Sequence, residues 1–365
     1  MLNSKIVELQ KATLTFMKDG NLKKSLETIN LAIDLDKHVA INHYLKGRIC
    51  HELMIFQESI SSYKQYLSLE KCFDGNDTYR RAQFHLSICY FTLRNFKEGS
   101  KLYHFRHKAT ALDRFKNKRV WDQNIDKGKV LIWAEQGIGD EILFLRFLKA
   151  LENSECQFSL ECDSRIHRIV NINFPYIQLI ERGSEINLEH FAYHLPLGDL
   201  LSIFHEKLAN VSHPYISMPL DEKVEKIREE FKGKEIVGIS WRSLSPDYHL
   251  ERSKKLKDVC QSLNPDKDIL INLQPSVLDE ELYQMEKLGF KVINSCDCKN
   301  DIDTVFQLIL ICTKVITVAN SVAHFAGALG KKTILWLPEH PTWRWGQGMV
   351  TSDLYPSIEL KGSKS

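Results

Sequence analysis

The chain has 365 residues, of which 43% are hydrophobic and 26% are charged, and its formal net charge is +2 at pH 7. This composition excludes a disordered or low-complexity protein, and the length predicts two or three globular domains. No run of about 18 apolar residues is present, so we expect no transmembrane segment. The charged, amphipathic N-terminus does not resemble a signal sequence, and we expect a cytoplasmic protein.

The charge is distributed unevenly along the chain. Residues 1–116 contain 19 Lys and Arg against 12 Asp and Glu, a net charge of +7, which leaves −5 for the remainder. These charges form no clustered basic stripe, so the sequence argues against a nucleic-acid-binding protein. A solvated helical surface explains the excess, and an acidic or phosphorylated partner for this part stays an open alternative.

The cysteines indicate reduced thiols rather than a disulfide framework. There are nine of them, an odd number at scattered positions. Cys296 and Cys298 form the only close pair, and they lack further Cys or His residues at ligand spacing. We therefore expect no metal site.

Residues 1–116 have helical periodicity and contain an internal repeat. Leu22, Phe56 and Phe96 occupy equivalent positions, 34 and 40 residues apart, and a turn-rich insertion at residues 73–77 accounts for the difference. In each unit a small residue follows three positions later and a large residue four positions after that. These residues are Ser25, Ser59 and Gly99, then Ile29, Tyr63 and Tyr103. The spacing predicts helices that pack against their neighbours.

The preceding helices align in the same way, with Gly47 and Ser87 at one position and Phe16, Cys50 and Tyr90 at another. These features resemble the tetratricopeptide repeat (TPR) over about two and a half to three units. A plain helical bundle is the alternative. Stacked helix pairs commonly bind peptides or partner proteins on a concave surface, but the repeat names no partner.

From Lys127 onward, short apolar strands alternate with amphipathic helices, which predicts parallel sheets. We expect strands at 130–134, 157–162, 178–181, 236–241, 269–274, 291–294, 315–318 and 333–337. We expect helices at 140–151, 164–173, 221–231, 255–263, 279–287, 301–312 and 321–329. The predicted class is α + α/β, with helical repeats over 1–116 and two Rossmann-like lobes over 117–220 and 221–365.

The first lobe contains the most informative stretch, VLIWAEQGIGDEILFLRFL at residues 130–148. A buried-strand pattern leads into a turn in which Gly137 and Gly139 permit close backbone approach. Asp140 follows at the start of a helix, at the edge of the sheet where ligands bind in open α/β proteins. It is the first candidate for chemistry, and a helix N-cap is the structural alternative.

The second lobe contains KVITVANSVAHFAGALGKKTILWL at residues 314–337. The pattern predicts a strand, a short polar turn and a helix that begins near Asn320 and Ser321. Free backbone N–H groups and the positive helix end make this a candidate phosphate site. His324 lies one turn further, where it would contact a diphosphate or sugar hydroxyl, or serve as a structural residue.

Polar and basic residues follow two other strands of this lobe. The strand at 236–241 ends at Trp241 and leads into Arg242 and Ser243, and Lys254 follows one short loop later, beside Arg252 and Lys255. The strand at 269–274 ends at Gln274. Arginine at the carboxyl end of a parallel strand suits bidentate binding of phosphate oxygens, so these residues are candidates for one anion-binding cleft. For each basic residue alone, a solvated surface position is the alternative.

The combination of AEQGIGDEILFLRFL, VGISWRS, NLQP, NSVAHFAGALGKKT and PTWRWGQGMVTSDLYPSIELK resembles one enzyme family. It is similar to glycosyltransferases of the ADP-heptose heptosyltransferase group (family 9-like) that carry N-terminal TPRs. The resemblance covers residues 1–360 and implies a GT-B fold, with acceptor on the first lobe and donor on the second. It also implies metal-independent, inverting transfer that needs no cofactor, with a nucleotide-diphosphate sugar as co-substrate.

By this resemblance Asp140 is the general base, and Gln136, Gly137 and Gly139 form the acceptor-side loop. The donor site contains Trp241, Arg242, Ser243, Lys254, Gln274, Asn320, Ser321 and His324. Heptosyltransferase-like members commonly have Asp-Thr where this chain has Ala319-Asn320. The departure favours a donor sugar other than heptose, or a weakened active site.

The leading hypothesis is a glycosyltransferase whose repeats recruit a protein acceptor, such as a surface or flagellar protein. The alternatives are a lipid-linked or lipopolysaccharide saccharide as acceptor, a non-catalytic TPR/GT-B scaffold, and a sugar-nucleotide epimerase. Trp343, Trp345 and Tyr355 fit the packing of a C-terminal segment across both lobes better than stacking on a base or sugar.

Overall fold

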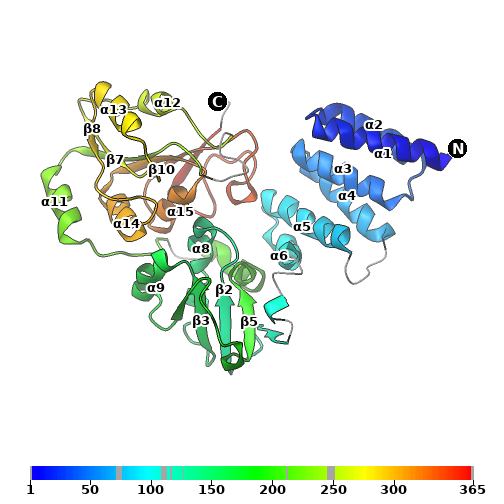
Figure 1. The fold of residues 1–365 in the computed structure, drawn as a ribbon, viewed down its shortest axis with the longest axis horizontal. Helices are drawn as coiled ribbons and strands as arrows, with labels where there is room; N and C mark the ends of the chain where they lie inside the picture. Colours follow the sequence, from blue (N-terminus) through cyan, green and yellow to red (C-terminus); the bar gives the residue numbers. More distant parts are fainter. Residues whose placement is uncertain are drawn as a thin grey trace. The chain divides into compact units, whose positions relative to one another are not determined.

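The computed structural model describes residues 2–70, 76–107, 113–115, 117–125, 127–210, 213–244 and 251–362. The chain divides into two compact units, shown in Figure 1. The helical unit contains Met1–Lys116 and Thr342–Gln347, and the α/β unit contains Asn117–Pro341 and Gly348–Ser365. The sequence placed residues 342–347 in the second lobe, whereas the structure groups them with the helices.

Six α-helices form the described part of the helical unit, and each contacts the next along the chain. They are α1 (Leu2–Lys18), α2 (Leu22–Leu35), α3 (Ala40–Glu52), α4 (Phe56–Leu69), α5 (Asp77–Thr92) and α6 (Phe96–Tyr103). Short 3₁₀ turns follow at His104–Arg106 and Asp113–Phe115. Residues 73–75 of the predicted insertion lie outside the described residues, and Asn76 caps α5 through its side chain.

The three helix pairs share one turn geometry. The second helix of each pair begins at Leu22, Phe56 and Phe96, the residues that the sequence repeat aligns. In each turn a backbone N–H donates to a carbonyl of the preceding helix at 2.8 Å, from Asn21 to Phe16, from Ile55 to Cys50 and from Asn95 to Tyr90. Each turn also contains one residue with positive φ, namely Gly20, Met54 and Arg94.

The small residues of the repeat let paired helices approach closely. Ser25 and Ser59 are buried, and their hydroxyls donate to the carbonyls of Thr13 and Gly47, each twelve residues earlier. At Gly99 a Cβ atom would lie 2.4 Å from a ring carbon of Phe91. The aligned large residues Ile29, Tyr63 and Tyr103 are also buried. These contacts agree with the packing that the spacing predicts.

The first sheet of the α/β unit is parallel, in the order β1-β5-β2-β3-β4. Its strands are β1 (Arg119–Val120), β2 (Lys129–Trp133), β3 (Gln157–Cys162), β4 (Gln178–Glu181) and β5 (Tyr193–Pro196). Its α-helices are α8 (Ile138–Leu145), α9 (His167–Asn173) and α10 (Leu200–Phe204). Because β3 and β5 lie on opposite sides of β2, the chain changes direction across the sheet at β2, where ligands commonly bind.

The second sheet is also parallel, in the order β11-β10-β9-β6-β7-β8. Its strands are β6 (Glu235–Ser240), β7 (Asp268–Asn272), β8 (Lys291–Ile293), β9 (Lys314–Val318), β10 (Thr333–Trp336) and β11 (Ile358–Lys361). Its helices are α11 (Glu222–Glu230), α12 (Leu256–Cys260), α13 (Asp279–Lys287), α14 (Ile302–Ile311) and α15 (Ser321–Ala328). The strand order reverses between β6 and β9, so the carboxyl ends of these strands form the crevice.

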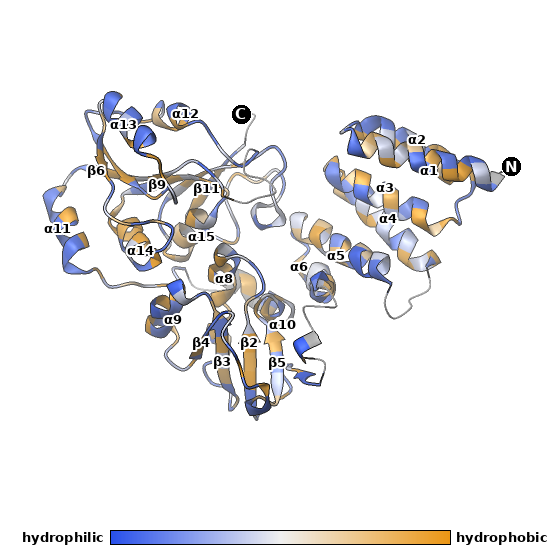
Figure 2. Cartoon of the chain, in the orientation of Figure 1, coloured by the Kyte–Doolittle hydropathy of each residue, from blue (hydrophilic) through white to orange (hydrophobic). Residues whose placement is uncertain are grey.

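The order of the elements, helices first and then two parallel sheets with their helices, confirms the predicted class of an α part followed by an α/β part. All eight predicted strands and all seven predicted helices have a counterpart. The sequence missed β1, β5, β11 and α10, which are short and lack a long apolar pattern. The helix predicted to extend to Leu151 ends instead at Leu145, and a separate 3₁₀ turn covers Leu148–Leu151. Figure 2 shows hydrophobic residues along β2, β3 and β5, whereas α11 and α13 are mostly hydrophilic.

A buried arginine connects the two lobes of the α/β unit. Arg146 follows α8, and its Nη2 donates to the carbonyl of Leu354 at 3.0 Å. The guanidinium lies over the rings of Tyr215 and Tyr355, 4.9 and 4.8 Å from their centroids. Tyr355 packs against Gly327 of α15, where a Cβ atom would lie 2.4 Å from the ring. Tyr355 therefore packs across both lobes, as the sequence indicates.

Trp343 has a different environment from the predicted one. Its ring centroid lies 4.9 Å from that of Phe91 and 5.9 Å from that of Tyr103, and Arg94 donates to its carbonyl at 2.7 Å. It therefore packs within the helical unit rather than between the lobes.

No described helix is both long and apolar enough to cross a membrane.

Candidate active site

Asp140 lies in the first turn of α8, directly beyond the carboxyl end of β2. Gly137 is the N-cap residue, and the backbone N–H of Asp140 donates to the Gly137 carbonyl at 2.8 Å. Asp140 is thus the third helical residue and not the N-cap that the structural alternative assumed. Its half-buried carboxylate lies at the positive end of the helix dipole, which favours negative charge.

An ion pair between the buried Glu141 and the exposed Arg182 holds the turn before Asp140. Arg182 donates from Nη1 to Glu141 Oε1 at 3.0 Å and to the Gln136 carbonyl at 2.7 Å. The backbone N–H of Asp163 donates to the other Glu141 oxygen at 3.0 Å. Burial raises the pKa of Glu141, and these partners oppose that shift. Glu141 and Arg182 were not predicted as site residues from the sequence, although Glu141 directly follows Asp140.

Gly139 brings the N-terminal ends of α8 and α15 together. The two helices contact each other and are neighbours in Figure 1. A Cβ atom at Gly139 would lie 2.9 Å from Cδ2 of His324 and 3.4 Å from Cα of Ser321. The sequence predicted close approach of a ligand at this glycine, and the structure shows close approach of a helix. Asp140 and Ser321 consequently belong to one junction between the two lobes.

Asn320 caps α15 and connects the ends of β9 and β6. Its Oδ1 accepts from the Val322 N–H at 3.0 Å and from the Thr317 hydroxyl at 3.1 Å. Its Nδ2 donates to Ser240 Oγ at 2.8 Å and to the Arg242 carbonyl at 3.1 Å. Because an amide side chain makes four hydrogen bonds at most, these four contacts use all of the hydrogen-bonding capacity of Asn320. The predicted donor-binding residue therefore has a positioning role in this geometry.

Gln274, two residues beyond the end of β7, supports the same turn. Its buried Oε1 accepts from Ser240 Oγ at 3.2 Å, and from the backbone N–H groups of Trp241 and Arg242 at 3.0 and 2.8 Å. Its Nε2 donates to the Pro275 carbonyl at 3.0 Å. The side chain predicted to face the donor thus fixes the backbone that presents Arg242.

Arg242 is paired with the carboxylate of Glu281, a residue that the sequence did not predict for the site. Its Nη2 donates to Glu281 Oε2 and to the Ser276 carbonyl, both at 3.0 Å, and its side chain is 28% exposed. Glu281 Oε1 accepts from the Trp241 indole N–H at 3.0 Å. The Arg242 Nε atom is buried and has no partner among the described residues. One donor of this guanidinium is therefore not used by the described part of the protein.

Lys254 and Ser243 flank residues 245–250, which lie outside the described residues. The Lys254 backbone N–H donates to the Trp241 carbonyl at 2.8 Å, and its Nζ lies 5.5 Å from the centroid of the Trp336 ring at the end of β10. Ser243 is buried, and its N–H donates to Ser253 Oγ at 3.2 Å. The Lys254 ammonium thus lies at the carboxyl edge of the second sheet.

His324 is buried at the lobe junction. Its Nδ1 forms a hydrogen bond of 2.9 Å with the Tyr355 hydroxyl, and its ring contacts Gly139. This arrangement fits the structural alternative better than direct contact with a sugar. Ser321, the first residue of α15, is only half-buried.

The described residues contain no cluster of three or more His, Cys, Asp or Glu side chains that could hold a metal ion. The eight described cysteines are free, and Cys72 lies outside the described residues. The sulfur atoms of Cys296 and Cys298 lie 3.8 Å apart. Their mutual hydrogen bond lowers the pKa of Cys296 and raises that of Cys298, which burial raises further.

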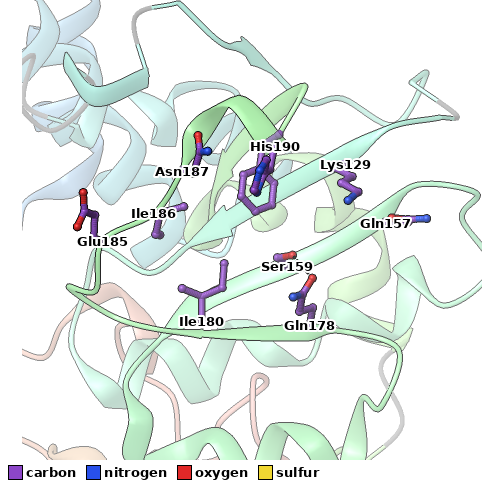
Figure 3. A pocket seen from close by; sticks show the side chains of 10 residues that line it. Lys129, Gln157, Ser159, Gln178, Ile180, Glu185, Ile186, Asn187 and His190 are labelled. Atoms are coloured by element: carbon purple, nitrogen blue, oxygen red, sulfur yellow. Dashed lines mark hydrogen bonds between the residues drawn. The ribbon is translucent and has the colours of Figure 1, made fainter.

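A separate pocket of about 290 Å³ lies over the first sheet, as Figure 3 shows. Lys129, Gln157 and Gln178, the first residues of β2, β3 and β4, line it together with residues 185–187 and 190–191. It therefore lies toward the amino ends of these strands, opposite to the end at which α8 begins. None of the predicted site residues lines it.

No protein-family model matches the chain. The curated protein FlbA of Caulobacter vibrioides (strain ATCC 19089 / CIP 103742 / CB 15) is 25% identical over 288 residues, which cover 68% of this chain and 46% of FlbA. The chain thus spans about half the length of the curated relative it matches.

Three solved structures illustrate the structural likeness. A glycosyl transferase family 9 protein from Veillonella parvula DSM 2008 has a TM-score of 0.47 and 11% identity, over 67% of this chain and 90% of that chain. The E. coli ADP-heptose lipopolysaccharide heptosyltransferase II has a TM-score of 0.40 and 10% identity, over 64% and 90%. A Thermobaculum terrenum O-GlcNAc transferase mutant has a TM-score of 0.29 and 10% identity, over 99% and 54%. Scores and identities this low establish no activity for this chain.

Proposed function

We propose that this protein is an inverting, metal-independent glycosyltransferase of the GT-B type, with TPR-like repeats that recruit a protein acceptor. The observation that carries the proposal is the contact of Gly139 with Ser321 and His324. It brings a carboxylate from the first lobe to the positive end of a helix from the second. The first lobe, over residues 117–220, would bind the acceptor, and the second lobe, over residues 221–365 without 342–347, would bind the donor.

In the proposed reaction, the acceptor hydroxyl oxygen attacks the anomeric carbon while Asp140 takes its proton. The bond from that carbon to the diphosphate oxygen breaks, and negative charge develops on the leaving nucleotide diphosphate. The N-terminal end of α15, Lys254 and the unpartnered Arg242 Nε are the donors available for this charge. Asn320 and Gln274 would act as positioning residues.

The pairing of Arg242 with Glu281 favours a second candidate, a non-catalytic scaffold that keeps the GT-B shape. A carboxylate 3.0 Å from the guanidinium competes with phosphate for the same charge. The hydrogen bonds that occupy Asn320 and Gln274 point in the same direction. The half-buried Asp140 at the junction argues for the enzyme.

The choice of acceptor depends on the helical unit. Successive helix pairs generally provide an extended surface for peptides and proteins, which supports a protein acceptor. A lipid-linked saccharide stays the alternative, with the repeats then binding an assembly partner.

Thermal stabilisation by a panel of nucleotides and nucleotide sugars tests the donor, because a ligand that binds only the native state raises stability. With the donor identified, Asp140→Asn should reduce sugar transfer by about 10²–10⁴-fold. It should leave the melting temperature and donor binding nearly unchanged. Full transfer activity in Asp140→Asn would disprove the base assignment, and a folded protein that binds no nucleotide would favour the scaffold.

A further inference from the structure

The helical unit contains a pocket of about 200 Å³ between α3, α4 and α5. All of its lining residues belong to the helical unit. These residues are Tyr44, Arg48, His51, Glu52, Tyr63, Arg81 and His85.

The base of the pocket is Tyr63, one of the aligned large residues of the repeat. Its ring packs against Gly47, where a Cβ atom would lie 2.8 Å away, and stacks on the His85 ring at an interplanar angle of 10°. The Tyr63 hydroxyl is buried and has no hydrogen-bond partner within the described residues. Because buried hydroxyls are almost always paired, this one points to a group that the pocket receives.

Two arginines and one glutamate, Arg48, Arg81 and Glu52, are the charged residues that line the pocket. Arg48 and Arg81 have side chains that are 39% and 65% exposed, and each is only loosely paired within its own helix. Arg48 lies 3.9 Å from Glu52, and Arg81 lies 4.0 Å from Asp77.

Two histidines, His51 and His85, also line the pocket. The rings of His51 and His85 have centroids 5.7 Å apart. Burial lowers the pKa of His85 to about 4, and the charges of His51, Arg48 and Arg81 contribute to the shift. The pocket therefore disfavours a further positive charge, and the exposed Arg48 and Arg81 are the groups that an anion would pair with.

The size of the pocket limits the ligand to a group about as large as one side chain. Pairs between an anion and an exposed arginine are individually weak, so a lone small anion would gain little. Several acidic groups on one extended chain would gain more, because residues 1–116 carry a net charge of +7.

We propose that this pocket binds an acidic side chain of a partner peptide, with its carboxylate directed to the Tyr63 hydroxyl and neighbouring acidic residues at Arg48 and Arg81. The inference rests on the part of the proposed function that gives the helical unit a protein partner. It does not depend on sugar transfer.

The test uses the full chain and a fluorescein-labelled hexaglutamate peptide, with fluorescence anisotropy at pH 7 and low salt. Hexaglutamate should bind, and a hexaglutamine peptide should not. Arg48→Gln and Arg81→Gln should each weaken binding about fivefold to tenfold. Lys97→Gln is the matched control, because it removes one charge from the exposed surface of α6 and should change the affinity less than about twofold.

Tyr63→Phe tests the hydroxyl separately, since it keeps the ring that packs on Gly47. It should weaken hexaglutamate binding at an unchanged melting temperature, and unchanged affinity would overturn the proposed position of the carboxylate. Equal losses of hexaglutamate affinity in Lys97→Gln and Arg48→Gln would show general charge attraction and would also overturn the proposed binding at this pocket. So would binding of inorganic phosphate without binding of hexaglutamate. Nucleotide binding and the Asp140→Asn result are measured independently, so this proposal and the glycosyltransferase proposal fail separately.

Discussion

At the scale of single residues, Gly139 decides whether the two lobes can form their junction. Gly139→Ala would place a Cβ atom 2.9 Å from the His324 ring and 3.4 Å from the Ser321 Cα. We expect a loss of about 1–3 kcal/mol in the free energy of unfolding, because the packed helices must shift. Urea unfolding of the α/β unit, followed by Trp fluorescence, measures this loss.

Gly137→Ser provides the control two residues earlier. No atom lies within 4 Å of a Cβ at Gly137, and serine is a good N-cap residue. This variant should be as stable as the parent or slightly more stable. Equal destabilisation by both substitutions would mean that the turn, rather than the contact with α15, limits stability.

The pairing of Arg242 is also a property of individual residues. Glu281→Gln removes the negative charge 3.0 Å from the guanidinium and retains an amide oxygen for the Trp241 indole. If Arg242 faces the nucleotide diphosphate, the Glu281→Gln variant should bind that diphosphate about threefold to tenfold more tightly than the parent. Isothermal titration calorimetry measures this affinity. Glu280→Gln, an exposed change on the same helix, should have no effect. Weaker binding in Glu281→Gln would place the diphosphate away from Arg242.

At the scale of secondary-structure elements, α5 contributes a pH-dependent term to stability through His85. Its pKa is lowered from 6.5 to about 4 by burial, with smaller effects from His51, Arg48 and Arg81. Burial lowers the pKa of His51 as well. Between pH 6.5 and about pH 4, the unfolded chain therefore binds more protons than the native chain. The free energy of unfolding consequently falls as the pH decreases from 6.5 toward 4.

The loss attributable to His85 should approach about 3 kcal/mol at the acidic end of this range. Hydrogen exchange of peptides that cover α3 to α5, corrected for intrinsic rates, measures it. His85→Phe should flatten the pH dependence, whereas His38→Phe, at an exposed position, should preserve it. An unchanged slope in His85→Phe would assign the dependence to other groups.

At the scale of the whole molecule, residues 342–347 belong to the helical unit although they follow most of the α/β unit in sequence. Arg94 and the Trp343 carbonyl that it contacts are 249 positions apart. Gln347 Nε2 also donates to the Met54 carbonyl at 3.2 Å. This segment therefore covers apolar surface of α5 and α6 that the repeat alone would leave exposed.

Trp343→Ala removes the ring that packs on Phe91 and Tyr103. We expect the helical unit to lose about 3–5 kcal/mol of stability, as for other buried aromatic truncations. Faster hydrogen exchange in α5 and α6 would report it. Val350→Ala, at a side chain that is 77% exposed, should leave the exchange unchanged. Unchanged exchange in Trp343→Ala would show that the segment does not stabilise these helices.

The sequence by itself determined the features that depend on local periodicity. The helix pairs, the equivalent positions of Leu22, Phe56 and Phe96 and most strands could be predicted, because the side-chain pattern records which face of an element is buried. Short strands such as β1 and β11 were missed, because a few residues carry little pattern. The alternation of strands and helices was also enough to predict two parallel sheets.

Only the tertiary structure decided the contacts between distant segments. The approach of Gly139 to Ser321, the pairing of Arg242 with Glu281 and the position of Trp343 in the helical unit belong to this group. Each depends on strand order and on the paths of long connections, which local side-chain patterns do not record. The residues of the candidate site could therefore be named from the sequence, whereas their partners could not.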